Sequence, residues 1–318
     1  MADRRQLTAD VKERARALGF SAVGIADATQ ENDDGVRLQE WLDGGFAASM
    51  QWMGRRARER SDPAAVLPGV RSVIVVSMNY FVPGDVPEGA PKISRYARGA
   101  DYHDVMGARM QEYARWIQET IPGATAKWYV DTGPVMEKAW AGRAGIGWIG
   151  KHTTLISPVD GSWIFLGVIL TTASLIADEP AVDRCGTCTA CIDVCPTAAI
   201  VEPYVLDARR CIAYLTIEHR GAFDPALAAS LDGWIFGCDA CQDVCPWNTK
   251  LAHPTDEGAF APRAQALAPD VHALMRMDEK EFAGLFAGTP VVRAKAAGMK
   301  RNCAALLGGE RSIDPGPR

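Results

Sequence analysis

The stretch CGTCTACIDVCP, residues 185–196, places four cysteines within eleven residues and ends on a Cys–Pro pair. A second stretch, GCDACQDVCPWN at residues 237–248, carries three cysteines where a repeat of the first would carry four. Cys211 lies alone between the two. The spacing Cys-x2-Cys-x2-Cys-x3-Cys-Pro is typical of bacterial ferredoxins that hold two 4Fe–4S clusters.

In ferredoxins of this type the first three thiolates of a run bind one cluster, and the fourth, turned away before its proline, binds the other. Cys211 then completes the second set. The predicted ligands are Cys185, Cys188, Cys191 and Cys245 for one cluster and Cys195, Cys211, Cys238 and Cys241 for the other. Four thiolates also suit tetrahedral zinc, but zinc ribbons rarely place three cysteines at two-residue intervals before x3-Cys-Pro. Cys303, among alanines and leucines, is expected to be a buried apolar residue.

The composition is that of a soluble globular protein. The chain has 318 residues, a formal net charge of −5, 48% hydrophobic residues and 23% charged residues, which is enough for two or three small domains. No apolar run is long enough to span a bilayer, and the N-terminus lacks a signal-peptide core. We therefore expect a cytoplasmic protein without membrane association, whose cysteines bind metal rather than form disulfides.

Residues 1–180 alternate helical and strand patterns. The first segment reads as an amphipathic helix, with Thr8 as its N-cap and Gly19 at its end. The later patterns predict strands at 21–28, 71–81, 126–132 and 161–175 and helices at 101–120 and 133–145. This order predicts an α/β (α+β) domain with a largely covered sheet. Residues 181–250 form the cysteine-rich, ferredoxin-like domain, and residues 251–318 return to helix.

Three features of the first domain are candidates for a functional site. GIGWIG at 145–150 satisfies G-x-G-x-x-G, but it follows a helix and leads into a strand, which is the wrong order for a dinucleotide fold. Asp131 ends a predicted strand just before Gly133–Pro134, where it either faces the crevice of an α/β sheet or caps the next helix. His103, in SRYARGADYHDV (94–105), is either a base or metal ligand or simply the start of the following helix.

Basic residues gather in four short stretches, at 54–60, 208–210, 218–221 and 292–301. Taken singly, each is typical of a solvated helix face rather than of a phosphate-binding patch. The composition therefore leaves a nucleic-acid partner open.

Several longer motifs, together with the eight cysteines, resemble the epoxyqueuosine reductase family over roughly residues 8–305: RYARGADYH, YVDTGPVMEKAWA, GIGWIGKHTTLI, GSWIFLG, CIAYLTIEHRG and GCDACQDVCPWN. The resemblance implies a cobalamin-binding α/β domain, distantly similar to flavin nitroreductases, followed by a two-cluster ferredoxin domain and a short HEAT-like helical C-terminus. It also implies the last step of queuosine synthesis, which removes the epoxide oxygen from epoxyqueuosine at the wobble position of transfer RNA.

The resemblance also implies roles for individual residues. Asp131 is the implied proton donor. The implied cobalamin contacts are Arg60, Ser94, Arg95, Asp131, Lys151, His152, Thr154, Ser157, Leu166, Thr216 and Asp239. The implied RNA contacts are Arg209, Arg210, His219 and Arg220 near the mouth of the pocket and Lys295, Lys300 and Arg301 farther along the RNA.

The implied chemistry is a reduction driven by single electrons. A flavodoxin- or ferredoxin-type donor supplies them through the clusters to cobalt, which acts on the epoxide while Asp131 protonates the departing oxygen. A free aspartate has a pKa of about 3.9, so an acid role requires burial in an apolar pocket that raises the pKa of Asp131. The modified base is expected to leave its stack and enter the pocket. Nothing in the sequence calls for more than a monomer.

Many members of this family continue into HEAT-like repeats that grip the RNA, whereas this sequence stops at Arg318 with room for one helix pair. The catalytic assignment does not depend on those repeats, but the C-terminal share of RNA affinity stays open. Other interpretations also stay open. A reductive dehalogenase shares the cofactors but typically carries a twin-arginine signal, and here no apolar segment follows DRRQL. An electron-carrier subunit predicts no tight cobalamin and no turnover, and a redox-sensing RNA-binding protein predicts RNA affinity without chemistry.

Overall fold

Four strands form the central sheet, in the spatial order β1-β2-β7-β4. The computed structural model describes residues 4–29, 33–84, 86–87 and 89–310. The strands are β1 (Ala22–Asp27), β2 (Ser72–Asn79), β7 (Ile164–Thr171) and β4 (Ala126–Tyr129). Each neighbouring pair is antiparallel, with Ile74 of β2 opposite Ile169 of β7. All four strands lie within the ranges that the sequence predicts.

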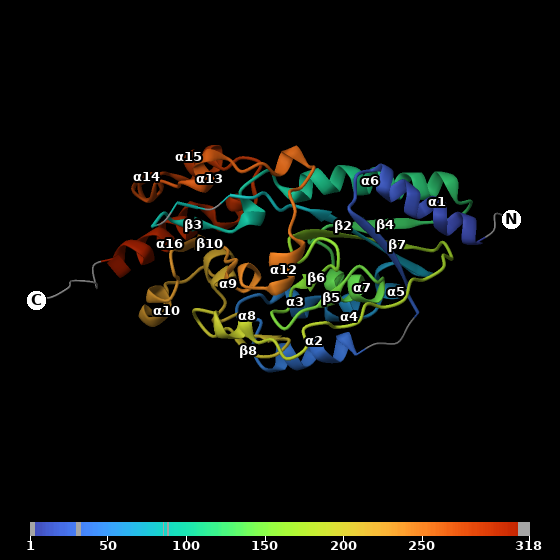
Figure 1. Ribbon diagram of the computed structural model, residues 1–318, viewed down its shortest axis with the longest axis horizontal. Helices are drawn as coiled ribbons and strands as arrows, with labels where there is room; N and C mark the ends of the chain where they lie inside the picture. Colours follow the sequence, from blue (N-terminus) through green and yellow to red (C-terminus); the bar gives the residue numbers. More distant parts are fainter. Residues whose placement is uncertain (1–3, 30–32, 85, 88, 311–318) are drawn as a thin grey trace, which may run out of the picture.

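Helices cover both faces of this sheet (Figure 1). α1 (Arg4–Ala17) and α6 (Tyr102–Thr120) pack on one face and share a core with Ile74. α5 (Pro63–Val66) and α7 (Glu137–Arg143) pack on the other, against Val73 and Val75. Because successive strand residues point to opposite faces, the fully buried β2 contributes to both cores. This confirms the mixed α/β class and the covered sheet. Among the described residues, no helix is both long and apolar enough to cross a membrane.

Two expectations for this region are wrong. Thr8 does not cap α1 but lies inside it, where the Thr8 hydroxyl donates to the carbonyl of Arg4 at 2.7 Å. The sheet is antiparallel, so the rule that places ligands at the carboxyl ends of parallel strands gives no reason for the position of Asp131. The position of this carboxylate has to be explained by its own loop.

The glycine-rich stretch 145–150 joins α7 to a short hairpin, β5 (Trp148–Ile149) and β6 (Leu155–Ile156). A Cβ on Gly147 would lie 2.2 Å from the carbonyl oxygen of Ile156, and one on Gly145 would lie 2.7 Å from that of Glu179. These glycines let the protein's own backbone segments approach each other. The stretch follows a helix, as expected, and it does not form the strand-to-helix turn of a dinucleotide site.

The cysteine-rich region is built from short elements joined by turns. They are α8 (Ala190–Asp193), β8 (Ile200–Glu202), β9 (Val205–Leu206), α9 (Ile212–Ile217), α10 (Pro225–Ala229), β10 (Trp234–Phe236), α11 (Ala240–Asp243) and α12 (Pro246–Leu251). The helices α2 (Asp34–Asp43), α3 (Trp52–Arg55) and α4 (Ala57–Ser61) lie in the lower part of Figure 1, and α2 packs against α4.

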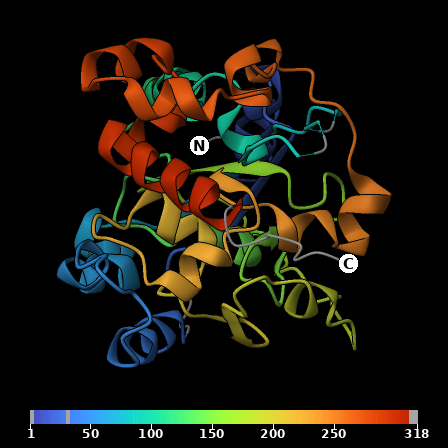
Figure 2. The same cartoon turned by 90° about the vertical axis from the view of Figure 1, so that its left-hand side faces the viewer.

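The C-terminal helices gather at the end of the molecule away from the N-terminus, as Figure 2 shows end-on. They are η2 (Gly258–Phe260), α13 (Ala264–Leu267), α14 (Val271–Arg276), α15 (Glu279–Leu285), η3 (Pro290–Ala294) and α16 (Lys295–Glu310). Their core includes Cys303, which is fully buried as expected. It also includes Ile93 of β3 (Lys92–Ile93), which pairs with β10, and Ala97 of η1 (Arg95–Ala97). A segment of the first predicted domain thus packs with the last one.

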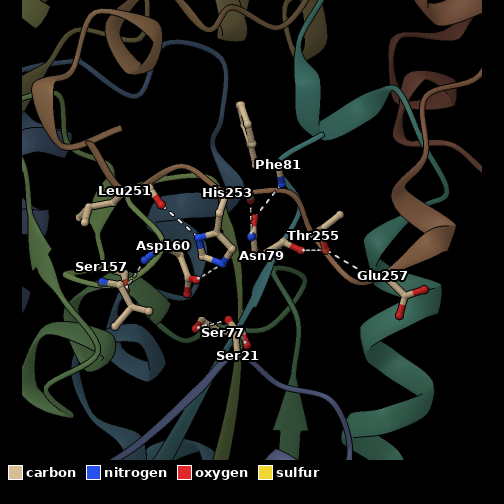
Figure 3. Close-up of polar contacts among 11 residues, drawn as sticks. Ser21, Ser77, Asn79, Phe81, Ser157, Asp160, Leu251, His253, Thr255 and Glu257 are labelled. Atoms are coloured by element: carbon tan, nitrogen blue, oxygen red, sulfur yellow. Dashed lines mark hydrogen bonds and ion pairs between the residues drawn. The ribbon is translucent and has the colours of Figure 1, made fainter. Parts of the chain in front are cut away.

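A polar network fastens the segment after α12 to the end of β2 (Figure 3). Asn79 donates from Nδ2 to the carbonyl of His253 at 2.9 Å, and Thr255 donates from Oγ1 to the carbonyl of Asn79 at 2.6 Å. The imidazole Nε2 of His253 lies 3.4 Å from the buried carboxylate of Asp160. Because buried polar groups require partners, this network fixes the cysteine-rich region against the sheet.

Candidate active site and iron–sulfur centre

Asp131 lies in the loop that joins β4 to α7, and its backbone takes a left-handed conformation with φ +58°. For a non-glycine residue this conformation is strained, and such strain gathers at functional sites. Gly133 allows the tight fold-back, since a Cβ there would lie 2.2 Å from the Tyr129 ring. α7 begins at Glu137, and Met136 occupies its N-cap position without a side-chain cap. The helix-cap alternative for Asp131 is therefore wrong, and its carboxylate is 66% exposed.

The first turn of α6 supplies the partners of this carboxylate. The hydroxyl of Tyr102 donates to Oδ2 of Asp131 at 2.7 Å, and Nε2 of His103 lies 3.7 Å from the same oxygen. The other ring nitrogen of His103 lies 2.7 Å from Oδ1 of Asp101, which also caps the helix. Tyr102 is held by stacking on Phe165, with ring centroids 4.3 Å apart. His103 thus both begins α6 and lies between two carboxylates.

These contacts place the proton on histidine rather than on aspartate. Burial alone would lower the pKa of His103, but the hydrogen bonds and charges of Asp101 and Asp131 outweigh it and raise the pKa to about 9. The close approach of the charged His103 ring, aided by the hydrogen bond from Tyr102, holds the pKa of Asp131 below its ordinary value. The expectation that burial raises the pKa of Asp131 is therefore wrong in this structure. A carboxyl group whose pKa is raised by burial does occur on α7, where the pKa of Glu137 is about 7.

The His103–Asp131 pair predicts a pH-dependent stability. The pKa of His103 is higher in the folded protein than in the unfolded chain. Its contribution is therefore complete below about pH 6.5 and is lost as the pH rises through about 9. Solvent screening limits that contribution to about 1 kcal/mol. We expect the Tm advantage of the wild type over His103→Gln to shrink between pH 7 and pH 10 in anaerobic thermal melts. An advantage that stays constant over this range would contradict the ion pair.

The seven cysteines of the two motifs and Cys211 converge in two groups. Cys185, Cys188, Cys191 and Cys245 line one cavity of about 200 Å³, which we call the cysteine cavity. Burial raises the pKa of Cys191 most, and the charges of the other three cysteines of this group raise it further. In the other group, Cys211 and Cys195 both raise the pKa of Cys238 in the same way, and Cys238 and Cys211 do so for Cys241. Cys191 of the first group also acts on Cys241, so the two groups lie close to each other. The division of the ligands between two clusters, as the crossed ferredoxin pattern gives it, remains a prediction.

Lys138 on α7 connects the Asp131 loop with the second cysteine group. Its ammonium donates to the carbonyl of Thr153 at 2.7 Å. It interacts electrostatically with the carboxylate of Asp131 and with the thiols of Cys241 and Cys211. The second cysteine group therefore lies on the side of the protein where Asp131 is exposed.

A basic pocket of about 500 Å³ lies near this loop. Three segments far apart in the sequence line it: Ser49, Met50 and Trp52; Glu218, His219, Arg220 and Gly221; and Arg293 and Lys295. Arg293 makes two bonds to Glu218, at 2.9 and 3.0 Å. Trp52 is 44% exposed, and the guanidinium of Arg60 lies 5.4 Å from its ring centroid. Arg60 also reaches the carbonyl of Gly133 at 3.5 Å, so pocket and Asp131 loop adjoin.

The expected cobalamin contacts fall into three places. Arg60 joins Asp131, as above. Ser94 and the backbone of Arg95 both donate to the buried carboxylate of Asp239, whose pKa is raised by burial to about 6. Lys151 and His152 line the cysteine cavity.

The remaining expected contacts use their polar groups within the fold. The amide of Thr154 donates to Nδ1 of His152 at 3.1 Å. Ser157 accepts from the amide of Val159 at 3.1 Å, and Thr216 is fully buried and donates to Ile212 at 2.7 Å. Leu166 packs half-buried against the α7 side of the sheet. As cobalamin contacts, all of these residues remain predictions.

The expected RNA contacts divide in the same way. His219, Arg220 and Lys295 line the basic pocket. Arg209 and Arg210 are exposed, with Arg209 paired to Asp207, and Lys300 is half-buried. Arg301 donates to the carbonyl of Leu215 at 2.8 Å, so its guanidinium holds α9 to α16. None of these roles toward RNA is tested by the structure.

Sequence reasoning missed Trp52 and Arg293 in the pocket, and Tyr102 as a partner of Asp131. Trp52 lies in the stretch SMQWMGRR (49–56), which has no helical or strand periodicity that would single it out. Only the fold brings it next to residues 218–221 and 293–295. Tyr102 and His103 were visible as a polar cluster, but their carboxylate partner lies nearly thirty residues away.

Two family models match the chain. Residues 60–132 match "Epoxyqueuosine reductase QueG, DUF1730", and residues 184–248 match "4Fe-4S double cluster binding domain". The second match covers all eight cysteines of the two groups and decides for iron–sulfur clusters over zinc.

Similar proteins share most of the length of this chain. An epoxyqueuosine reductase of Gloeobacter violaceus is 47% identical over 94% of this chain and 95% of its own length. One of a Synechocystis species is 46% identical over 90% of this chain and 100% of its own length. Relatives of this kind are therefore about as long as the present sequence.

Solved structures agree with the fold. Epoxyqueuosine reductase from Bacillus subtilis, solved with its catalytic loop swung out of the active site, superposes with a TM-score of 0.89 at 26% identity over 98% of this chain and 83% of that one. An epoxyqueuosine reductase bound to a modified tRNA-Tyr stem loop superposes with a TM-score of 0.87, also at 26% identity and with the same coverage.

Proposed function

This chain belongs to the epoxyqueuosine reductase family, and from that premise we propose that it reduces the epoxide of epoxyqueuosine at the wobble position of transfer RNA. The reaction converts an epoxide to an alkene and water, and it consumes two electrons and two protons. Electrons reach the site through two 4Fe–4S clusters, held by the two cysteine groups.

The observation that carries the proposal is the position of the Asp131–His103 pair. Arg60 links the Asp131 loop to the basic pocket, because it reaches the carbonyl of Gly133 and lies over the exposed ring of Trp52. Lys138 interacts electrostatically with Asp131 and also with Cys211 and Cys241. A proton source thus lies near both a surface suited to single-stranded RNA and a source of electrons.

Cobalamin is the proposed cofactor at this site. Nε of Arg60 and Oε1 of Glu137 are buried and have no hydrogen-bond partner within the described chain. Buried polar atoms normally find partners, and a ligand with a rim of amide groups would supply them. When bound, cobalamin supplies a low-valent, nucleophilic metal centre for cleavage of the epoxide C–O bond. Arg60, Glu137 and the loop of Asp131 would hold its edge.

The chain's own groups handle the proton. At neutral pH His103 carries it and Asp131 is the exposed carboxylate. The pair titrates as a unit, so Asp131 can receive the proton from His103 and pass it to the departing oxygen. The hydroxyl of Tyr102 fixes the orientation of the carboxylate at 2.7 Å. This arrangement supplies an acid at pH 7 without a strongly raised aspartate pKa.

Trp52 gives the RNA side of the proposal a test. Stacking of a base on an aromatic ring contributes about 1–3 kcal/mol. We therefore expect Trp52→Ala to weaken binding of an anticodon stem loop by about 5- to 100-fold, and Trp52→Phe to weaken it much less, in fluorescence anisotropy titrations. Wild-type affinity in Trp52→Ala would remove this ring from the RNA surface. Tyr204→Ala, which deletes an exposed ring near the cysteine cavity instead, is the control.

The remaining partners are part of the same proposal. The electron donor is a small flavodoxin- or ferredoxin-type protein, and the enzyme acts as a cytoplasmic monomer. Sedimentation of the purified protein with and without RNA checks the monomer.

The direct test is anaerobic turnover. Protein with reconstituted clusters, cobalamin and a strong one-electron reductant is incubated with transfer RNA from cells blocked at epoxyqueuosine, and the nucleosides are analysed by mass spectrometry. Loss of one oxygen mass, dependent on cobalamin, supports the proposal. No conversion with clusters, cobalamin and RNA demonstrably bound would refute the proposal and show that the substrate is a different one, whereas no conversion together with no cobalamin binding would favour the electron-carrier interpretation.

A further inference from the structure

Lys151 reaches from the glycine-rich hairpin into the loop of the first three cysteines. Its side chain is 9% exposed, and its ammonium donates to the carbonyls of Gly186 at 2.7 Å and of Cys188 at 2.9 Å. The backbone carbonyl of Lys151 accepts a hydrogen bond from the amide of Tyr204 at 3.1 Å, which fixes the backbone of Lys151. The sequence assigned Lys151 to cobalamin, but the structure directs its charge to the wall of the cysteine cavity.

Trp148, three residues earlier, faces the same cavity. It packs with Cys245 and Cys185, and its ring meets that of Trp247 edge-on with centroids 5.0 Å apart. The indole is 4% exposed, yet its Nε1–H has no hydrogen-bond partner within the described chain. The donor without a partner therefore lies among the cysteines of the first group, where a bound cluster would offer it sulfur acceptors. Figure 1 shows the β5–β6 hairpin beside α12, which follows Cys245.

We propose that Lys151 and Trp148 raise the reduction potential of the cluster bound by Cys185, Cys188, Cys191 and Cys245, and so make it the site at which an external donor delivers each electron. Reduction adds one negative charge to the cluster. A buried ammonium and an N–H···S hydrogen bond both stabilise that charge. Cys188 is exposed, so this cluster is also the accessible one.

The second cluster has a different surrounding. Lys138 lies near Cys211 and Cys241, but its charge is shared with the carboxylates of Asp131 and Glu137, and the residue is exposed. The sulfur of Cys195 accepts a hydrogen bond from the backbone amide of Ala199 at 3.2 Å and lies 3.9 Å from the hydroxyl of Thr197, so its hydrogen-bonding neighbours are uncharged. Lys151 therefore acts on the reduction potential of the first cluster and takes no part in the proton chemistry around Asp131.

The test is a potentiometric titration of the reconstituted protein, followed by EPR, without RNA or cobalamin. It is therefore independent of whether the proposed reaction occurs. Cys188→Ser identifies the signal of this cluster. We expect Lys151→Met to lower its potential by about a tenfold change in the one-electron equilibrium constant, about 59 mV. Trp148→Phe should lower it by a smaller amount, and Lys151→Arg should stay near the wild type.

Lys250→Met is the matched control, because Lys250 lines the same cavity but is solvent-exposed. The proposal holds if Lys151→Met and Trp148→Phe each lower the potential of the cluster that Cys188→Ser identifies and leave the other cluster unchanged. Lys250→Met must leave both potentials unchanged. It is overturned if both potentials stay at their wild-type values, if both move equally, or if Lys250→Met has the same effect. If Lys151→Met fails to load its cluster, Trp148→Phe decides: an unchanged potential there overturns the proposal.

Discussion

Asp131→Asn is expected to lower turnover of epoxyqueuosine in transfer RNA by about 10²- to 10⁴-fold, the usual contribution of a positioned acid. Asparagine keeps the shape of the side chain and can still contact Tyr102, which lies 2.7 Å from Oδ2. It cannot accept a proton from His103 and pass it on. Cluster content and RNA affinity should remain at the wild-type level, and single-turnover nucleoside mass spectrometry measures the loss.

The matched control is Asp104→Asn. Asp104 is an exposed carboxylate in the first turn of the same helix and lies next to His103. The Asp104→Asn variant should therefore reduce epoxyqueuosine at the wild-type rate. Full activity in Asp131→Asn, with both clusters and cobalamin bound, would show that another acid protonates the oxygen, and Glu137 would then be the next residue to test, since burial raises its pKa to about 7.

Removing Cys245 is expected to abolish turnover and one whole cluster. This cysteine lies sixty residues after Cys185 in the sequence, yet both line the cysteine cavity. Cys245→Ala should therefore reduce iron from about eight to about four atoms per chain. Iron analysis and the EPR intensity of the reduced protein measure the change.

A double variant makes the crossed pattern decisive. If Cys188 and Cys245 serve the same cluster, Cys188→Ala combined with Cys245→Ala retains the same iron as either single variant. If Cys245 instead serves the cluster of Cys238 and Cys241, the double variant loses nearly all of its iron. Cys303→Ala, in the core of the C-terminal helices, should keep both clusters.

The presence of two iron–sulfur clusters was predictable because their signal is local. A tight loop with two-residue gaps directs successive sulfurs inward, and this geometry depends on spacing alone. The strands were predictable for a similar reason, since a run such as that of β2 is buried on both faces wherever it lies. The strand directions were not, because the antiparallel pairing of β4 with β7 depends on connections that periodicity does not record.

The chemistry around Asp131 shows the same division. The sequence and its family resemblance indicated this residue, but they led to an expectation of a buried acid. The structure instead pairs an exposed carboxylate with His103, which lies twenty-eight positions earlier and carries the proton. A pKa depends on charges within a few ångströms, and such neighbours are assembled by the fold.

By itself, the sequence determined two iron–sulfur clusters and a covered sheet, and it indicated Asp131 as the candidate acid. Each follows from spacing or periodicity within a few tens of residues, or from motifs shared with a family. Only the tertiary structure decided which residues face one another: His103 with Asp131, Trp52 with Arg293 across the basic pocket, and Lys151 with the cysteine loop. The physical reason is that hydrogen bonds and charge interactions act over a few ångströms, whereas these partners are separated by up to about 240 residues of chain.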